Sequence, residues 1–122
     1  MRGLVIDDSR TMRMILGRML KELGFEVVGA ADGQAALDAI DSGAMPDLIL
    51  VDWNMPVMTG IDFIKVVRAE PYSSPAKIVM VTTETEIPRV VTALEAGADE
   101  YVMKPFTKEA ILEKLQLLGF EI

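Results

Sequence analysis

The 122-residue sequence contains no cysteine and no histidine. Without cysteine, the chain cannot form a disulfide framework, a zinc–thiolate site or a cysteine nucleophile. Without histidine, it cannot carry a Ser–His triad, an imidazole metal site or a phosphorylated histidine of its own. Any acid–base or metal chemistry must therefore come from carboxylates, hydroxyls, lysine or tyrosine.

The chain also lacks long apolar segments and an excess of positive charge. No stretch approaches the ~20 apolar residues of a membrane span, and the apolar run at residues 4–6 is too short for a signal peptide. Twelve Lys and Arg residues against 19 Asp and Glu residues give a net charge of −7, which disfavours a surface that grips nucleic acid phosphates. We therefore expect a cytoplasmic protein that binds neither membranes nor nucleic acid directly.

The sequence is rich in apolar residues, which make up 51% of it. Together with its length, this composition predicts one globular domain over residues 1–122, and we expect a monomer. Its most informative stretch is the run Leu-Ile-Leu-Val at residues 48–51, which leads into Asp52 and a turn containing Pro56. A continuous apolar run of this kind predicts a strand that is buried on both faces of a parallel sheet.

Five short apolar runs alternate with five amphipathic stretches along the chain. The runs cover residues 4–6, 27–28, 48–51, 78–81 and 101–103. The amphipathic stretches follow them, with Ser9 and Thr107 as caps of the first and fifth helices and Gly24 at the end of the first. In the fourth helix we expect Val90, Val91 and Leu94 to face the core, and in the first helix we expect the methionines to serve mostly in core packing.

This alternation predicts an α/β protein with a doubly wound (βα)5 fold. Right-handed crossovers place the helices on both faces of a parallel sheet, giving a three-layer sandwich of the flavodoxin-like type with strand order 2-1-3-4-5. In that order the topological switch point, where open α/β sheets bind ligands, lies between the first and third strands.

Polar side chains follow the predicted strands at their carboxyl ends. Asp7 and Asp8 come after the first strand, Asp52 after the third, Thr82 after the fourth and Lys104 after the fifth. Because these strand ends meet at one edge of the sheet, we expect the three aspartates to lie together at the switch point.

Three carboxylates in one crevice repel one another. Two unit charges ~4 Å apart cost about 4 kcal/mol at a surface-like dielectric constant, and with Lys104 the formal charge of the group is still −2. Either a pKa rises or a divalent cation binds, and an all-oxygen site with room for water and phosphate suits Mg²⁺. The metal and Lys104 could hold the oxygens of a transferring phosphoryl group while Asp52 attacks as the nucleophile. The Thr82 hydroxyl could donate to a third oxygen.

The whole chain resembles the receiver domain of two-component response regulators, and within that family the single-domain chemotaxis regulators of the CheY type. The resemblance rests on motifs that occur in the expected order on the expected strand ends. These are Asp7-Asp8, the run Val51-Asp52-Trp53-Asn54-Met55-Pro56, Gly60, Thr82, and the run Tyr101-Val102-Met103-Lys104-Pro105-Phe106.

The resemblance implies roles for these residues. Asp52 resembles the phosphoacceptor, which takes its phosphoryl group from a sensor histidine kinase or from small acyl phosphates. Asp8, Asp52 and the carbonyl of Asn54 resemble the Mg²⁺ ligands, with Asp7 acting through water. Lys104 resembles the lysine that pairs with the phosphoryl group, and its bond to Pro105 is often cis in such proteins.

The resemblance also implies a conformational switch and a set lifetime of the phosphorylated state. Thr82 and Tyr101 resemble the switch pair, in which the hydroxyl moves toward the phosphate and the ring turns inward. Asn54 and Glu84 match the positions that tune hydrolysis of the phospho-aspartate, and this pair implies a signal lasting seconds to minutes. The output partner implied is a flagellar motor switch protein or another output protein. The chain would then be no enzyme beyond its own phosphorylation and dephosphorylation.

Two departures from the family pattern bear on these expectations. Thr83 is bulkier than the small residue common after the switch threonine, and Glu86 stands near the start of the fourth helix, which is basic in enteric chemotaxis regulators. A stand-alone receiver in another phosphorelay therefore stays open as an alternative.

A Mg²⁺-dependent phosphatase with an aspartyl intermediate is a second alternative. However, those that resemble haloacid dehalogenases need an acid two residues after the nucleophile, where this chain has Asn54. In a flavodoxin-like electron carrier, Asp7 and Asp8 would repel the flavin phosphate.

Overall fold

The computed structural model describes residues 1–43, 45–53, 55–83 and 87–122, with the side chains of Ile87 and Arg89 outside the description. Within these residues five strands alternate with five helices, as the sequence predicts. In chain order they are β1 (Arg2–Ile6), α1 (Arg10–Glu22), β2 (Glu26–Ala30), α2 (Gly33–Ser42), β3 (Leu48–Asp52), α3 (Gly60–Arg68), β4 (Lys77–Thr82), α4 (Ile87–Ala96), β5 (Glu100–Met103) and α5 (Lys108–Leu117).

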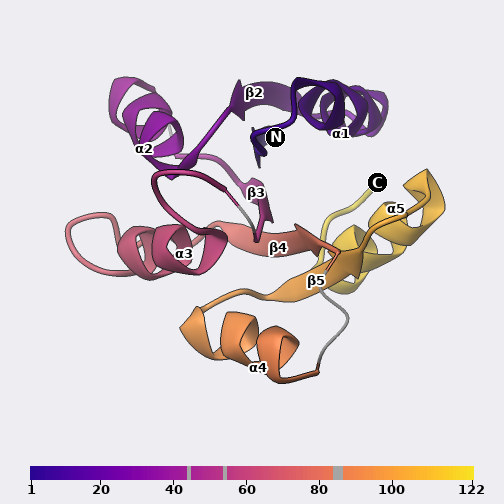
Figure 1. Ribbon diagram of the computed structural model, residues 1–122. Helices are drawn as coiled ribbons and strands as arrows, with labels where there is room; N and C mark the ends of the chain where they lie inside the picture. Colours follow the sequence, from indigo (N-terminus) through magenta and orange to yellow (C-terminus); the bar gives the residue numbers. More distant parts are fainter. Residues whose placement is uncertain (44, 54, 84–86) are drawn as a thin grey trace.

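The strands form one parallel sheet in the order β2-β1-β3-β4-β5, which confirms the predicted topology. Helices α1 and α5 lie on one face of the sheet, and α2, α3 and α4 lie on the other (Figure 1). The result is a three-layer sandwich with β3 at its centre.

Two apolar clusters, one on each face of the sheet, form the core. The cluster under α2, α3 and α4 includes Ile49, Val51 and Phe63, and the cluster under α1 and α5 includes Leu48, Leu50 and Leu16. Consecutive residues of β3 enter opposite clusters because side chains alternate across a strand. All five residues of β3 are buried, so the continuous apolar run reflects burial on both faces.

Side-chain caps determine where the helices begin. The oxygens of Ser9 and Thr107 accept hydrogen bonds from the backbone N–H groups of Met12 and Ala110, at 3.2 and 3.1 Å. Both caps agree with the prediction. Asp32 and Thr59 cap α2 and α3 in the same way. Since each cap follows a short loop from a strand end, the caps hold these loops in place.

One part of the predicted helix packing is wrong. Among the described side chains of α4, Ala93 is buried against the core, whereas Val90 is half-buried and Val91 and Leu94 are each 43% exposed. Ala93 belongs to the apolar cluster beneath α4 and Ala96 packs against that cluster. The small side chains make the contact, so the larger ones on the flank stay in solvent. In α1, Met12 and Met19 pack against the apolar cluster beneath the helix, as predicted, whereas Met14 is 58% exposed.

No helix among the described residues is both long enough and apolar enough to cross a membrane.

Candidate functional site

The register of the sheet places Asp7 beside Asp52. Ile6 pairs with Val51 in the parallel ladder between β1 and β3, so Asp7, which follows β1, lies beside Asp52, the last residue of β3. The backbone N–H of Asp7 still donates to the carbonyl of Ala30 on β2, at 3.1 Å. The switch point of the sheet therefore carries two buried aspartates, Asp7 at 1% exposure and Asp52 at 8%.

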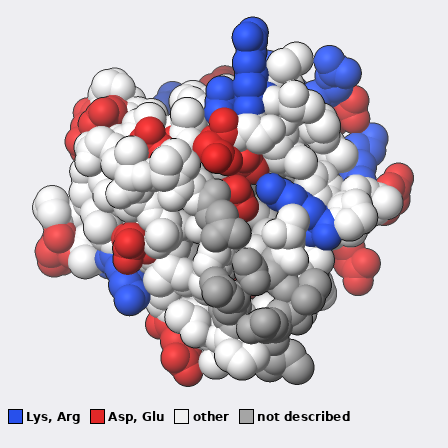
Figure 2. All heavy atoms as spheres, in the orientation of Figure 1, with Lys and Arg blue, Asp and Glu red and all other residues white. Residues whose placement is uncertain are grey.

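Asp8 completes a group of three carboxylates. Asp7, Asp8 and Asp52 each offer an oxygen, and these oxygens lie within 4.8 Å of one another. Asp8 is exposed, so the group opens to solvent on one side. On the molecular surface a group of acidic side chains lies next to a basic one near the middle of the face in view (Figure 2). Three carboxylates at this spacing form an all-oxygen donor set of the kind that Mg²⁺ prefers.

Among the described side chains, Lys104 forms ion pairs with this group. It follows β5, where its backbone N–H donates to the Thr82 carbonyl at 2.7 Å and its bond to Pro105 is cis. Its ammonium Nζ lies 3.2 Å from Asp7 Oδ2 and 3.6 Å from Asp52 Oδ1. With one lysine against three aspartates, the group keeps a formal charge of −2.

Burial is the largest influence on the carboxyl of Asp52, and it raises the pKa of that group. The Lys104 ammonium opposes the shift, while the charges of Asp7 and Asp8 add to it. The backbone N–H of Trp53, which stabilises the ionised form, is the smallest of these effects on the pKa. A carboxylate that is desolvated and crowded by like charges is stabilised by any cation or electrophile that binds it.

The structure also places Thr82 and Tyr101 near the site. Thr82 ends β4 and is buried, at 3% exposure, next to the strand that leads to Lys104. Tyr101 is opposite Met80 in the ladder between β4 and β5, and its half-buried ring packs against the cluster under α4. The geometry brings together Asp7, Asp8, Asp52 and Lys104 directly, with Thr82 on the neighbouring strand. Asn54 and Glu84, which the sequence predicted as a metal ligand and as tuning residues, lie outside the described residues.

Arg13 is a residue of the site region that the sequence reasoning missed. Its guanidinium Nη1 donates to the carbonyl of Asp7 at 2.7 Å, while Asp7 Oδ1 accepts the N–H of Ser9 at 2.9 Å. These two contacts hold the turn between β1 and α1. The sequence feature that could have predicted this contact is the spacing from Asp7 to Arg13. It places Arg13 on the second turn of a helix that begins next to Asp7.

Gly60 is the first residue of α3, and its backbone lies against the end of β3 at Asp52. Its N–H donates to the carbonyl of Trp53 at 3.0 Å. A Cβ at this position would collide with the carbonyl oxygen of Asp52 and lie 3.1 Å from Met80 Cε. The close approach of the two backbones requires a residue without a side chain.

We therefore expect Gly60→Ala to destabilise the fold by about 2 kcal/mol, since the clash is with backbone that cannot move aside cheaply. Gly17→Ala is the matched control, because a Cβ there meets its nearest neighbour, Val27 Cγ1, at 3.6 Å. This control should be neutral or stabilising by up to about 1 kcal/mol, as alanine is a better helix former. Urea unfolding followed by Trp53 fluorescence measures both changes, and equal stabilities for the two variants would contradict the prediction.

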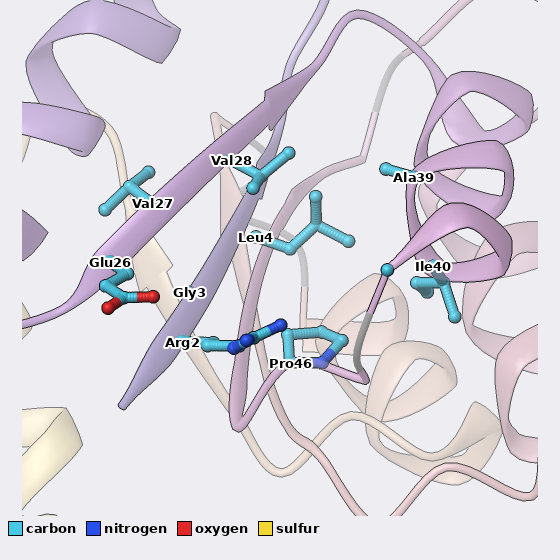
Figure 3. A pocket seen from close by; sticks show the side chains of 10 residues that line it. Arg2, Gly3, Leu4, Glu26, Val27, Val28, Ala39, Ile40 and Pro46 are labelled. Atoms are coloured by element: carbon cyan, nitrogen blue, oxygen red, sulfur yellow. The ribbon is translucent and has the colours of Figure 1, made fainter.

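A hollow lies at the end of the sheet opposite the three aspartates. It has a volume of about 270 Å³ and lies between β2 and α2, with Leu4, Val28 and Ile40 among its apolar walls and Arg2 and Glu26 among its charged ones (Figure 3). These strand residues are at the amino ends of β1 and β2, whereas the aspartates follow the carboxyl ends. None of the residues that line it belongs to the acidic group, so the hollow is not part of this site.

Residues 4–116 match the response regulator receiver domain family. The parallel sheet with three aspartates at its switch point thus agrees with the sequence match, and the chain belongs to the receiver domain family of two-component response regulators.

Within the family, the similarity is to chemotaxis proteins. The chain is 43% identical to the chemotaxis protein CheY1 of Helicobacter pylori strain J99 over 119 residues, which cover 97% of this chain and 96% of that protein. It is 41% identical to the chemotaxis protein CheY of Pseudomonas aeruginosa, covering 95% and 94% of the two chains. The crystallised chemotaxis response regulator CheY4 of Vibrio cholerae superposes with a TM-score of 0.86 at 39% identity, covering 96% and 97%. The chain is therefore the receiver domain of a CheY-like chemotaxis response regulator.

Proposed function

We propose that Asp52 is the phosphoacceptor of this receiver domain and that the chain, as one domain over residues 1–122, carries a chemotaxis signal from a sensor histidine kinase to an output protein. The observation that carries the proposal is the position of Asp52. It is a buried carboxylate with a raised pKa, it is crowded by Asp7 and Asp8, and it lies 3.6 Å from the Lys104 ammonium. Its environment favours reaction with an electrophilic phosphorus.

In the proposed reaction, an Oδ atom of Asp52 forms a bond to phosphorus as the bond to the donor breaks. From a phosphohistidine, the P–N bond breaks and the imidazole nitrogen takes the electron pair. In this step the Lys104 ammonium turns from Asp7 and Asp52 toward one phosphoryl oxygen, and the Thr82 hydroxyl donates to another. The side chains of Asp7, Asp8 and Asp52 would hold Mg²⁺, directly or through water. When bound, the ion supplies positive charge that offsets the −2 of the site and the charge of the phosphoryl oxygens.

The output step extends the proposal to Tyr101. Movement of Thr82 toward the phosphoryl group would free space next to β5, and the Tyr101 ring would turn inward. We propose that this change raises the affinity of the surface around β5 for a flagellar motor switch protein. Asn54 and Glu84 are proposed to set the lifetime of the phospho-aspartate. A monomer acting in the cytoplasm, without direct contact to nucleic acid or membrane, fits this role, as does a chain with no catalytic activity beyond its own phosphorylation and dephosphorylation.

Trp53, the only tryptophan in the sequence, reports on this proposal because it directly follows Asp52 and is half-buried. We expect Mg²⁺ to change its emission and acetyl phosphate to quench it further and reversibly. Asp52→Asn should keep part of the Mg²⁺ response and lose the second step. A wild-type protein that shows neither step is not a phosphoacceptor.

For the output, a motor switch peptide should bind more tightly when Mg²⁺ and beryllofluoride are present, and an unchanged affinity would remove the motor from the proposal.

A further inference from the structure

The ring of Tyr101 contacts a residue from the opposite side of the sheet. Strand β5, which carries Tyr101, is an edge strand and lies between α4 and α5 (Figure 1). The Tyr101 side chain packs against the cluster under α4. Helix α5 covers the other face, where Ile111 and Leu115 are buried. Lys114 of α5 nevertheless reaches Tyr101 past the edge of β5, with its ammonium 5.1 Å from the centre of the ring. The ring and α5 are therefore connected across the sheet edge.

Glu100 holds this lysine in place. The Lys114 ammonium donates to Glu100 Oε1 at 3.1 Å, and the same oxygen accepts the backbone N–H of Tyr101 at 3.1 Å. The side chains of Lys114 and Glu100 are 31% and 24% exposed, so water screens the pair only in part. One carboxylate oxygen thus binds both the cation above the ring and the backbone that carries the ring.

We propose that Lys114 and Glu100 are positioning residues that hold the Tyr101 ring in its present orientation. The inference rests on the proposed switch role of Tyr101 and adds a second control on that switch, exerted from α5. An ammonium over the face of an aromatic ring is attracted to it, and at partly exposed sites the attraction corresponds to about a two- to fivefold preference. Rotation of the ring away from Lys114 forfeits this preference, so the contact weights the two ring orientations against each other.

Tyrosine labelled with ¹³C in the ring allows the orientation to be measured by NMR. The chain has two tyrosines, and Tyr72→Phe assigns their signals. In protein without Mg²⁺ or phosphodonor, Lys114→Met should shift the Tyr101 ring signals and change the population ratio about two- to fivefold. Lys114→Arg should restore the wild-type signals, because a guanidinium also stacks on the ring and pairs with a carboxylate.

Lys108→Met is the matched control. It removes the same charge from the same helix, but Lys108 pairs with Glu22, at 3.0 Å, and not with Glu100. We expect it to leave the Tyr101 signals unchanged. If Lys114→Met also leaves them unchanged, or if both variants shift them equally, the positioning role is overturned. Glu100→Gln is a second test of the same contact if Lys114→Met fails to fold. We expect it to shift the Tyr101 ring signals in the same direction but less, because it only weakens the ion pair with Lys114.

The same signals separate this inference from the proposed function. Mg²⁺ and beryllofluoride added to wild-type protein should move the Tyr101 ring. If they do not, the switch role of Tyr101 fails even when Lys114→Met shifts the ring. If Mg²⁺ and beryllofluoride move the ring but Lys114→Met has no effect in their absence, the switch role of Tyr101 stands and the positioning role of Lys114 is refuted.

Discussion

Replacing Asp52 with asparagine is expected to abolish phosphoryl incorporation and, at neutral pH, to stabilise the fold by about 1–2 kcal/mol. The two effects have the same origin. The Asp52 carboxylate is desolvated and repelled by Asp7 and Asp8, and Lys104 offsets this only in part. Asparagine keeps the shape and removes both the charge and the nucleophile. Intact-mass measurement after incubation with acetyl phosphate and Mg²⁺ checks the first effect, and urea unfolding in chelator checks the second.

The stability gain should depend on pH in a definite direction. Because the pKa of Asp52 is raised in the folded state, the folded chain binds more protons than the unfolded chain between the ordinary and the raised pKa. Wild-type stability therefore falls as the pH rises through that window, whereas the Asp52→Asn variant lacks this loss. The gain should vanish in acid below the ordinary carboxyl pKa. Asp62→Asn, an exposed aspartate of α3, is the control and should give neither the gain nor the loss of phosphorylation. A destabilised Asp52→Asn protein at neutral pH would contradict the electrostatic account.

Replacing Arg68 with methionine is expected to destabilise the fold by about 3 kcal/mol, the largest single loss of stability that we predict. Arg68 ends α3 and is only 24% exposed. Its guanidinium donates to the carbonyls of Ser74, Ala76 and Gly97 at distances between 2.6 and 3.0 Å. It also pairs with Asp99 at 2.8 Å. Methionine would leave these partly buried acceptors without their donor.

The network around Arg68 matters for the site because it places β5. Asp99 Oδ2 accepts the N–H of Ile78 at the start of β4, and Asp99 directly precedes β5, which leads to Lys104. Lys65→Met is the control, since Lys65 is an exposed cation of the same helix, and its stability should change by less than about 0.5 kcal/mol. Arg68→Lys should recover only part of the loss, because one ammonium cannot reproduce the fork of contacts. If Arg68→Met unfolds at the same urea concentration as Lys65→Met, the contacts of Arg68 contribute no stability.

The sequence by itself determined the layout of the fold. Short continuous apolar runs, typical of buried strands, alternate with segments whose apolar residues repeat about every 3.6 positions, as in an amphipathic helix. This alternation is a local property that can be recognised without tertiary contacts. The same holds for the caps at Ser9 and Thr107, whose side chains bond backbone three residues away. It also holds for the grouping of Asp7, Asp8 and Asp52, because parallel strands bring their carboxyl ends together whatever the details of packing.

The tertiary structure alone decided which side of a helix meets its neighbour and which long side chains meet across the fold. Val91 and Leu94 carry the apolar pattern of a buried face, yet Ala93 makes the contact because α4 approaches the core through small residues. Arg68 and Asp99 are 31 residues apart, and Lys114 reaches Tyr101 from the other face of the sheet. Flexible charged side chains have no sequence period that reveals their partners, and their contacts depend on how the packed layers align. That is why the sequence could predict that Asp52 lies with Asp7 and Asp8 at the switch point, while only the structure could reveal the contacts that Lys114 and Arg68 make.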